Sequence, residues 1–120
     1  MKRKDRGDLG EALAKDFLKK KGYRILETNY RCPQGEIDIV AVQKKCLVFV
    51  EVRTKSNLNF GTPEESITPA KKQHLKQSAY HYQQNHTGLP DAWRIDMVAV
   101  ELDSGNNPKR IEIIENALEE

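Results

Sequence analysis

The chain has 120 residues, the length of one domain, with 38% hydrophobic and 32% charged residues. Its 20 basic and 18 acidic side chains leave a net charge of +2, which is too small to indicate nucleic-acid binding by itself. Aliphatic runs such as Cys46–Val50 exclude an intrinsically disordered chain. No apolar stretch approaches the roughly 18 residues that a membrane helix needs, so we expect a cytoplasmic domain that does not enter a membrane.

Charged residues gather at the two ends of the chain. Residues 1–7 form a basic arm with Lys2, Arg3, Lys4 and Arg6, whereas residues 115–120 form an acidic tail. A basic arm can bind phosphates, but a solvated arm explains the same pattern, and both interpretations stay open.

The first predicted element is a helix that begins at Asp8. This side chain is placed as the N-cap, with Glu11 at the third helical position of a capping box. Apolar residues then follow at helical spacing (Leu9, Ala12, Leu13 and Phe17), and Gly22 ends the helix.

Three β-rich runs follow, at residues 23–28, 36–42 and 47–54. The last two are separated by Lys44 and Lys45, so they predict a hairpin at the centre of a sheet. Cys32 and Cys46 would lie at opposite ends of this hairpin, too far apart for a disulfide, and we expect two reduced thiols.

The second half of the chain repeats the alternation of helix and strand. Residues 56–65 are rich in Asn, Gly and Pro and predict a long loop, residues 69–84 a helix, and residues 93–101 and 110–114 two strands. The order αβββαββ predicts an α/β fold, with a mixed central sheet flanked by helices, in a single domain spanning residues 1–120.

Two carboxylates lie inside strongly hydrophobic strands, where an unpaired acid is costly. If Lys44 and Lys45 form a two-residue turn, the register places Asp38 opposite Glu51 and Glu36 opposite Arg53. Like charges that face each other across a ladder destabilise it by a few tenths to about 1 kcal/mol. A divalent cation between Asp38 and Glu51 removes this conflict, and Mg²⁺ suits one or two carboxylates with open positions for phosphate oxygens.

An ordinary buried ion pair is the alternative, with Arg53 or Arg94 neutralising the acids. The strand period of two places Glu51 and Arg53 on one face, which favours a common site. Glu11 stays open between the two interpretations, because the capping box explains it as well as a site does.

The acids and their neighbours resemble a known nuclease core. Asp38, followed by Glu51-Val52-Arg53 and preceded by the helical Glu11, is similar to the PD-(D/E)xK motif of archaeal Holliday-junction resolvases. A closer resemblance is to the YraN-like family of small bacterial proteins. It extends from about Gly7 to Val100 and rests on these segments in order: Gly10-Glu11, Gly22-Tyr23, Asn29-Tyr-Arg31, Gly35-Glu-Ile-Asp38, Val48-Phe-Val-Glu-Val-Arg53, Phe60-Gly61 and Arg94-Ile-Asp96.

The resemblance implies a restriction-endonuclease-like fold, with Glu11, Asp38 and Glu51 as ligands of Mg²⁺ or Mn²⁺. It implies hydrolysis of phosphodiester bonds in DNA, structure-selective on branched or recombination DNA, and a homodimer. The catalytic residues would be Asp38, Glu51 and Arg53. Arg53 departs from the motif, which has lysine there, and arginine cannot act as a base. Lys55 lies on the same strand face and can substitute.

Further lysines on the second helix, Lys71, Lys72 and Lys76, are candidates for contacts with nucleic-acid phosphates, as is Lys55. A solvated helix face explains the three helical lysines equally well. The sequence therefore leaves three functions: a metal-dependent endonuclease, a non-catalytic nucleic-acid-binding module on the same fold, or a scaffold that binds another protein.

Overall fold

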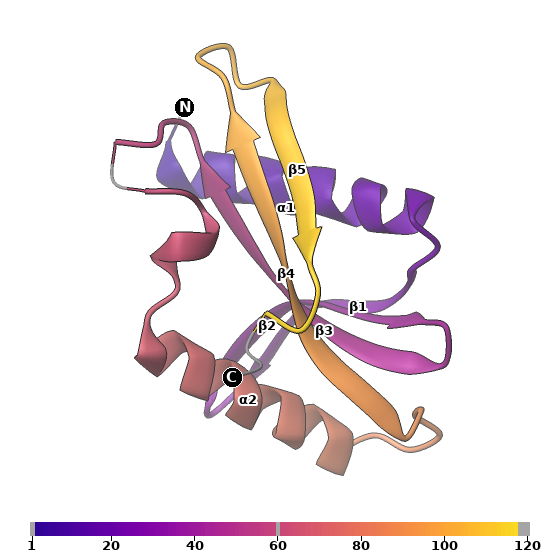
Figure 1. The fold of residues 1–120 in the computed structure, drawn as a ribbon. Coiled ribbons are helices and arrows are strands. Elements are labelled where there is room, and N and C mark those ends of the chain that lie inside the picture. The colour runs from indigo at the N-terminus through magenta and orange to yellow at the C-terminus, as the bar shows by residue number, and fades with distance from the viewer. Residues whose placement is uncertain (1, 60, 118–120) are drawn as a thin grey trace.

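A five-stranded sheet lies between two helices in the computed structural model, which describes residues 2–59 and 61–117 (Figure 1). The helices are α1 (Arg3–Lys20) and α2 (Pro69–Gln84), and a short 3-10 helix, η1 (Glu64–Ser66), precedes α2. The strands are β1 (Arg24–Cys32), β2 (Gly35–Gln43), β3 (Cys46–Lys55), β4 (Ala92–Leu102) and β5 (Pro108–Ile114). This element order confirms the predicted αβββαββ arrangement.

The sheet is mixed, as predicted. Its spatial order is β1-β2-β3-β4-β5, and only the central pair β3 and β4 is parallel. A parallel pair needs a long crossover, which α2 supplies by leading from the end of β3 back to the start of β4. Among the described residues, neither helix is long and apolar enough to cross a membrane.

The core has two apolar layers, one under each helix. Along β3, Val48 and Val50 belong to the layer under α1, whereas Leu47 and Phe49 belong to the layer under α2. This alternation follows from the strand period of two. Glu51 continues the row of Leu47 and Phe49, which directs its carboxylate toward α2.

The hairpin register agrees with the sequence prediction over most of its length. Lys44 and Lys45 have φ values of 49° and 63°, the two positive angles of a type I′ turn. Residue pairs then run without a shift from Gln43 and Cys46 to Ile39 and Val50. Both cysteines are free thiols, also as predicted.

The predicted start of the first helix is wrong. Helix α1 begins at Arg3 with Lys2 as N-cap, no side chain caps it, and Asp8 lies inside the helix. The amide of Arg6 already donates to the Lys2 carbonyl at 3.0 Å. Arg3–Gly7 are thus helical, since residues with good helix propensity extend the helix beyond the capping signal at Asp8. Gly22, with φ +90°, follows the helix end as predicted.

Helix α1 crosses β3 closely at a glycine. A Cβ atom added at Gly10 would overlap the Thr54 side chain, whereas one added at Gly7 would meet nothing within 4 Å. We expect Gly10→Ala to destabilise the protein, because overpacking costs about 1–3 kcal/mol and the gain in helix propensity returns only about 1 kcal/mol.

Gly7→Ala is the matched control for this prediction, because it brings the same propensity gain without the overlap. Thermal melts of the two variants provide the measurement. A Gly10→Ala melting temperature at or above that of Gly7→Ala would contradict the close crossing.

Candidate active site

The ladder between β2 and β3 ends where Asp38 begins. The last residue pair of this ladder is Ile39 with Val50, and the Asp38 carboxylate Oδ2 accepts a hydrogen bond from the Val52 amide at 2.7 Å. Asp38 and Glu51 are therefore not a ladder pair, which corrects the predicted direct opposition. The Asp38 carboxylate instead accepts a hydrogen bond from the β3 backbone, at the point where β2 separates from β3.

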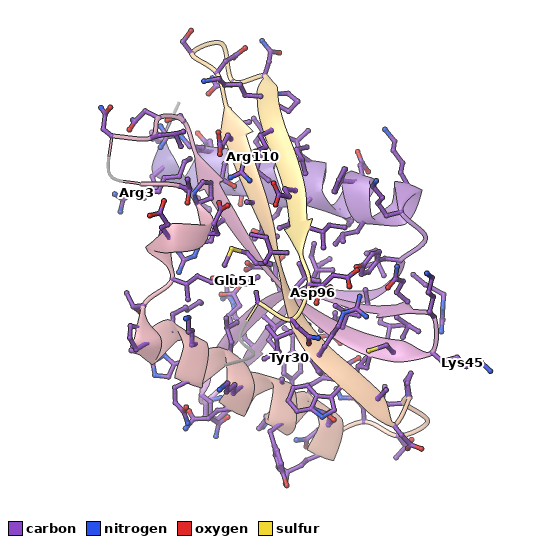
Figure 2. The ribbon with its side chains drawn as sticks, viewed as in Figure 1. Arg3, Tyr30, Lys45, Glu51, Asp96 and Arg110 are labelled. Atoms are coloured by element: carbon purple, nitrogen blue, oxygen red, sulfur yellow. The ribbon has the colours of Figure 1, made fainter. Side chains whose placement is uncertain are left out.

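Glu51 is buried, with 2% of its surface exposed. Its Oε2 atom lies 3.2 Å from Arg53 Nε and 3.6 Å from Lys71 Nζ of α2. Its Oε1 atom is buried and has no hydrogen-bond partner among the described residues. Figure 2 shows Glu51 between the central strands and the start of α2. The predicted ion-pair alternative is thus realised at Glu51, through Arg53, but it leaves one carboxylate oxygen unsatisfied.

The repulsion between the carboxylates of Asp38 and Glu51 changes the protonation of Asp38. Burial and, second, the negative charge of Glu51 raise the pKa of Asp38 from 3.8 to about 8, against smaller lowering by the Val52 amide and by Lys71. A carboxyl group with so high a pKa needs either a proton or a further cation. The pair therefore holds more negative charge than its surroundings neutralise.

Glu11 approaches the pair from α1. It lines the same cavity as Asp38, of about 440 Å³. Burial and, second, the charge of Asp38 raise the pKa of Glu11. Its Oε1 atom accepts a hydrogen bond from Asn29 Nδ2 at 2.8 Å, and this amide also reaches Glu36 at 3.3 Å. Charge coupling thus links Glu11 to the pair.

Asn29 is a site residue that the sequence analysis did not identify. It lies in β1 with a positive φ of 52°, a conformation that asparagine tolerates better than most residues. It follows directly after the run predicted over residues 23–28, and its place in the segment Asn29-Tyr-Arg31, on which the family resemblance rests, is the signal that could have revealed it.

A divalent cation fits Asp38 and Glu51. The donors are carboxylate oxygens, which Mg²⁺ and Mn²⁺ prefer, one of them is buried without a partner, and Mg²⁺ needs only one or two carboxylates besides water and substrate. The described residues do not bring three acidic, histidine or cysteine side chains close enough to form a complete metal site. Glu11, the third predicted ligand, is instead bound to Asn29.

The predicted phosphate-binding lysines occupy three different surroundings. Lys55 lines the cavity together with Arg53, two residues before it on β3. Lys71 lies one turn before the buried Leu75 and contacts Glu51. Lys72 and Lys76 are exposed on another face of α2. The structure therefore joins Lys55 and Lys71 to the site and leaves the other two on the surface.

Two expected ion pairs differ from the prediction. Glu36 lies 3.7 Å from Arg31, not beside Arg53, because the β2–β3 ladder ends before it. Arg94 does not neutralise the site acids: its Nε bonds the fully buried Asp96 at 2.9 Å, and its Nη2 bonds Gln43 at the turn end of the hairpin.

The loop before α2 forms another wall of the cavity, through Asn57 and Ser66. Arg110 of β5 anchors this loop, because its Nη2 bonds Glu64 of η1 at 2.7 Å while its other nitrogens bond Glu101 and Glu112 (Figure 2). The loop is therefore tied to the far edge of the sheet.

The five-stranded mixed sheet with its flanking helices has a restriction-endonuclease-like α/β arrangement, and the acids lie where β2 separates from β3. Residues 10–100 match the model of the uncharacterised protein family UPF0102. Similar proteins are UPF0102 proteins of Dehalococcoides mccartyi, 52% identical over 98% of this chain and 96% of the relative, and of Moorella thermoacetica, 47% identical over 98% of each. The chain belongs to the UPF0102 family, the YraN-like proteins that its sequence resembles.

Proposed function

We propose that this protein is a metal-dependent DNA endonuclease that hydrolyses phosphodiester bonds. The observation that carries the proposal is the pair of acids Asp38 and Glu51: Glu51 is buried with an unpartnered oxygen, and the half-buried Asp38 lines a cavity with basic walls. The carboxylates would bind a metal ion, and the basic side chains need an anion. A phosphate group that contacts both the metal ion and the basic side chains would satisfy them together.

The residues of the site divide the chemistry among them. Asp38 and Glu51 would hold Mg²⁺ or Mn²⁺, which when bound polarises a phosphate and lowers the pKa of water. Glu11 would join them as the third ligand if it released Asn29. Arg53 would stabilise negative charge that develops on the reacting phosphate. Lys55, on the same cavity wall, would take the place of the lysine that the motif has at position 53.

The resemblance to archaeal Holliday-junction resolvases supports a finer proposal about the substrate. The DNA would be branched or a recombination intermediate, and the active form a homodimer that cuts two strands. Such a substrate places the activity in the cytoplasm.

Cleavage of a panel of linear, nicked, flapped and four-way DNAs with Mg²⁺ or Mn²⁺ tests this function. We expect metal-dependent nicking, strongest on the branched DNAs. Intact DNA throughout the panel, at protein concentrations that bind it fully, would contradict the nuclease proposal.

A second candidate is a non-catalytic nucleic-acid-binding module. Arg53 favours it, because this arginine stands where the motif has lysine and pairs with Glu51 at 3.2 Å. DNA binding that is unaffected by Asp38→Asn and Glu51→Gln, without cleavage, selects this function. Absence of both DNA binding and cleavage selects a protein-binding scaffold.

The role of Arg53 gives a prediction of its own. We expect Arg53→Lys to keep or raise the cleavage rate, because lysine supplies the same charge and can also release a proton. Arg53→Ala should lower the rate by on the order of 10²–10³, the usual cost of removing one charge-stabilising donor. Single-turnover cleavage measures both. Full activity of the Arg53→Ala, Lys55→Ala double variant would remove this role.

A further inference from the structure

One side of the cavity is built by the first turns of α1, which the sequence presented only as a basic arm. Arg3, Arg6 and Gly7 line the cavity together with Glu11. Their spacings of three and four residues place them on one face of the helix. Arg3 and Arg6 therefore lie along the same cavity as Asp38, and Figure 2 shows Arg3 at the start of α1, well apart from Glu51.

Neither the exposed Arg3 nor the half-buried Arg6 has an acidic partner among the described residues. Within residues 2–59 and 61–117, no carboxylate lies within 4.0 Å of Arg3 or Arg6. The Nε atom of Arg6 is buried and has no hydrogen-bond acceptor in the part of the chain that the structure describes. A buried donor without an acceptor loses its hydrogen bonds to water without replacement, and the loss is larger when the donor is charged. An anion in the cavity would offset this loss.

The backbone of α1 is shaped so that this side of the cavity stays open. Gly10 allows α1 to approach Thr54, which brings the arginines to the end of β3. Gly7 leaves space, since a Cβ atom there would meet nothing within 4 Å. A Cβ atom at position 7, on the cavity wall, would therefore meet no neighbouring atom.

We propose that Arg3 and Arg6 form a second phosphate subsite, beside the carboxylate pair, that binds a neighbouring phosphate of the same nucleic-acid strand. This inference rests on the proposed function and specifies its substrate. The substrate is an oligonucleotide that occupies at least two phosphate positions, one beside Asp38 and Arg53 and one at the arginines. A single phosphodiester without flanking phosphates would use only half of the cavity.

The test is the salt dependence of DNA binding in a chelator, where no cleavage occurs. For duplex DNA, the logarithm of affinity falls against the logarithm of salt concentration with a slope of about −0.9 for each phosphate contact. We expect Arg3→Gln and Arg6→Gln each to make this slope shallower by about 0.9, and to lower the affinity about five-fold at 0.15 M salt. Fluorescence anisotropy with labelled duplex and four-way DNA measures both quantities.

Lys19→Gln and Lys20→Gln are the matched controls. They remove the same charge from the last turn of the same helix, where both lysines are exposed and away from the cavity. A second pair, Gly7→Glu and Gly7→Gln, changes the cavity without removing an arginine. The glutamate should weaken binding much more than the glutamine, because only its charge repels phosphate. Circular dichroism checks that every variant folds.

The outcomes separate this proposal from the nuclease proposal. Equal slopes for the arginine variants and the lysine controls would overturn the subsite, whether or not the protein cleaves DNA. Shallower slopes confined to the arginine variants would support it, even for a protein that cuts nothing. A wild-type protein that binds none of the DNAs would overturn both proposals.

Discussion

We expect Asp38→Asn and Glu51→Gln each to lower metal-dependent DNA cleavage by on the order of a hundred-fold or more. Removing residues that only support a metal ligand already costs about 10–100-fold, so removing a ligand should cost at least as much. Each substitution takes away one negative charge but keeps the shape of the side chain. Single-turnover cleavage of the best DNA in the panel, with saturating Mg²⁺, measures the loss.

The two substitutions need different controls. Asp91→Asn removes an exposed acid outside the described site and should cleave as the wild type does. Glu51→Gln also leaves Arg53 and Lys71 without their shared carboxylate, so its melting temperature must be compared before the rate is interpreted. Wild-type rates in either variant, in preparations free of contaminating nuclease, would contradict the proposed site.

The sequence predicted the features that depend on local patterns. The hairpin register followed from two charged turn residues between two alternating apolar runs, which fixes which residues face each other. The unusual position of Asp38 and Glu51 was visible because acids are costly in such strands. The mixed sheet followed from the predicted order αβββαββ, in which the helix over residues 69–84 lies between strands.

The features that the sequence did not predict depend on contacts between distant elements. The β2–β3 ladder ends before Asp38, where the Asp38 side chain binds the Val52 amide. The pattern of side chains in the sequence does not predict where backbone pairing stops. Arg6 reaches the cavity only because α1 extends back to Arg3 and crosses β3 at Gly10. Lys71 looked like part of an exposed basic stretch, yet helical geometry places it one turn before the buried Leu75 and beside Glu51.

The second large effect concerns stability without metal. We expect Asp38→Asn to melt higher than the wild type in a chelator at pH 8–9, because the wild type must hold the repelling charge of Asp38 beside Glu51. The asparagine keeps an oxygen that accepts the Val52 hydrogen bond. Asp38 has no cation within 4.0 Å among the described residues. Removing its charge therefore leaves no basic side chain without an ion-pair partner.

The sign of the pH dependence follows from the pKa of Asp38. Its folded value of about 8 lies above the ordinary value of 3.8, so between these pH values the folded protein binds a proton that the unfolded chain does not. The free energy of unfolding of the metal-free wild type should then fall as pH rises from 4 to 8, by at most about 1.4 kcal/mol per pH unit from this group. Asp38→Asn lacks this contribution, so its advantage should grow with pH over that window.

Magnesium should reverse the order of the two proteins. A ligand that binds only the folded state at ten times its dissociation constant adds about 1.4 kcal/mol to stability, which raises the melting temperature of a domain of this length by several degrees. The wild type should gain this stabilisation at pH 8, and Asp38→Asn should lose most of it. If the acids are instead held by ion pairs alone, removing one of them leaves a cation unpaired and lowers stability. A destabilised Asp38→Asn beside a wild type that does not respond to Mg²⁺ would therefore contradict the metal site, and the nuclease proposal would lose the observation on which it rests.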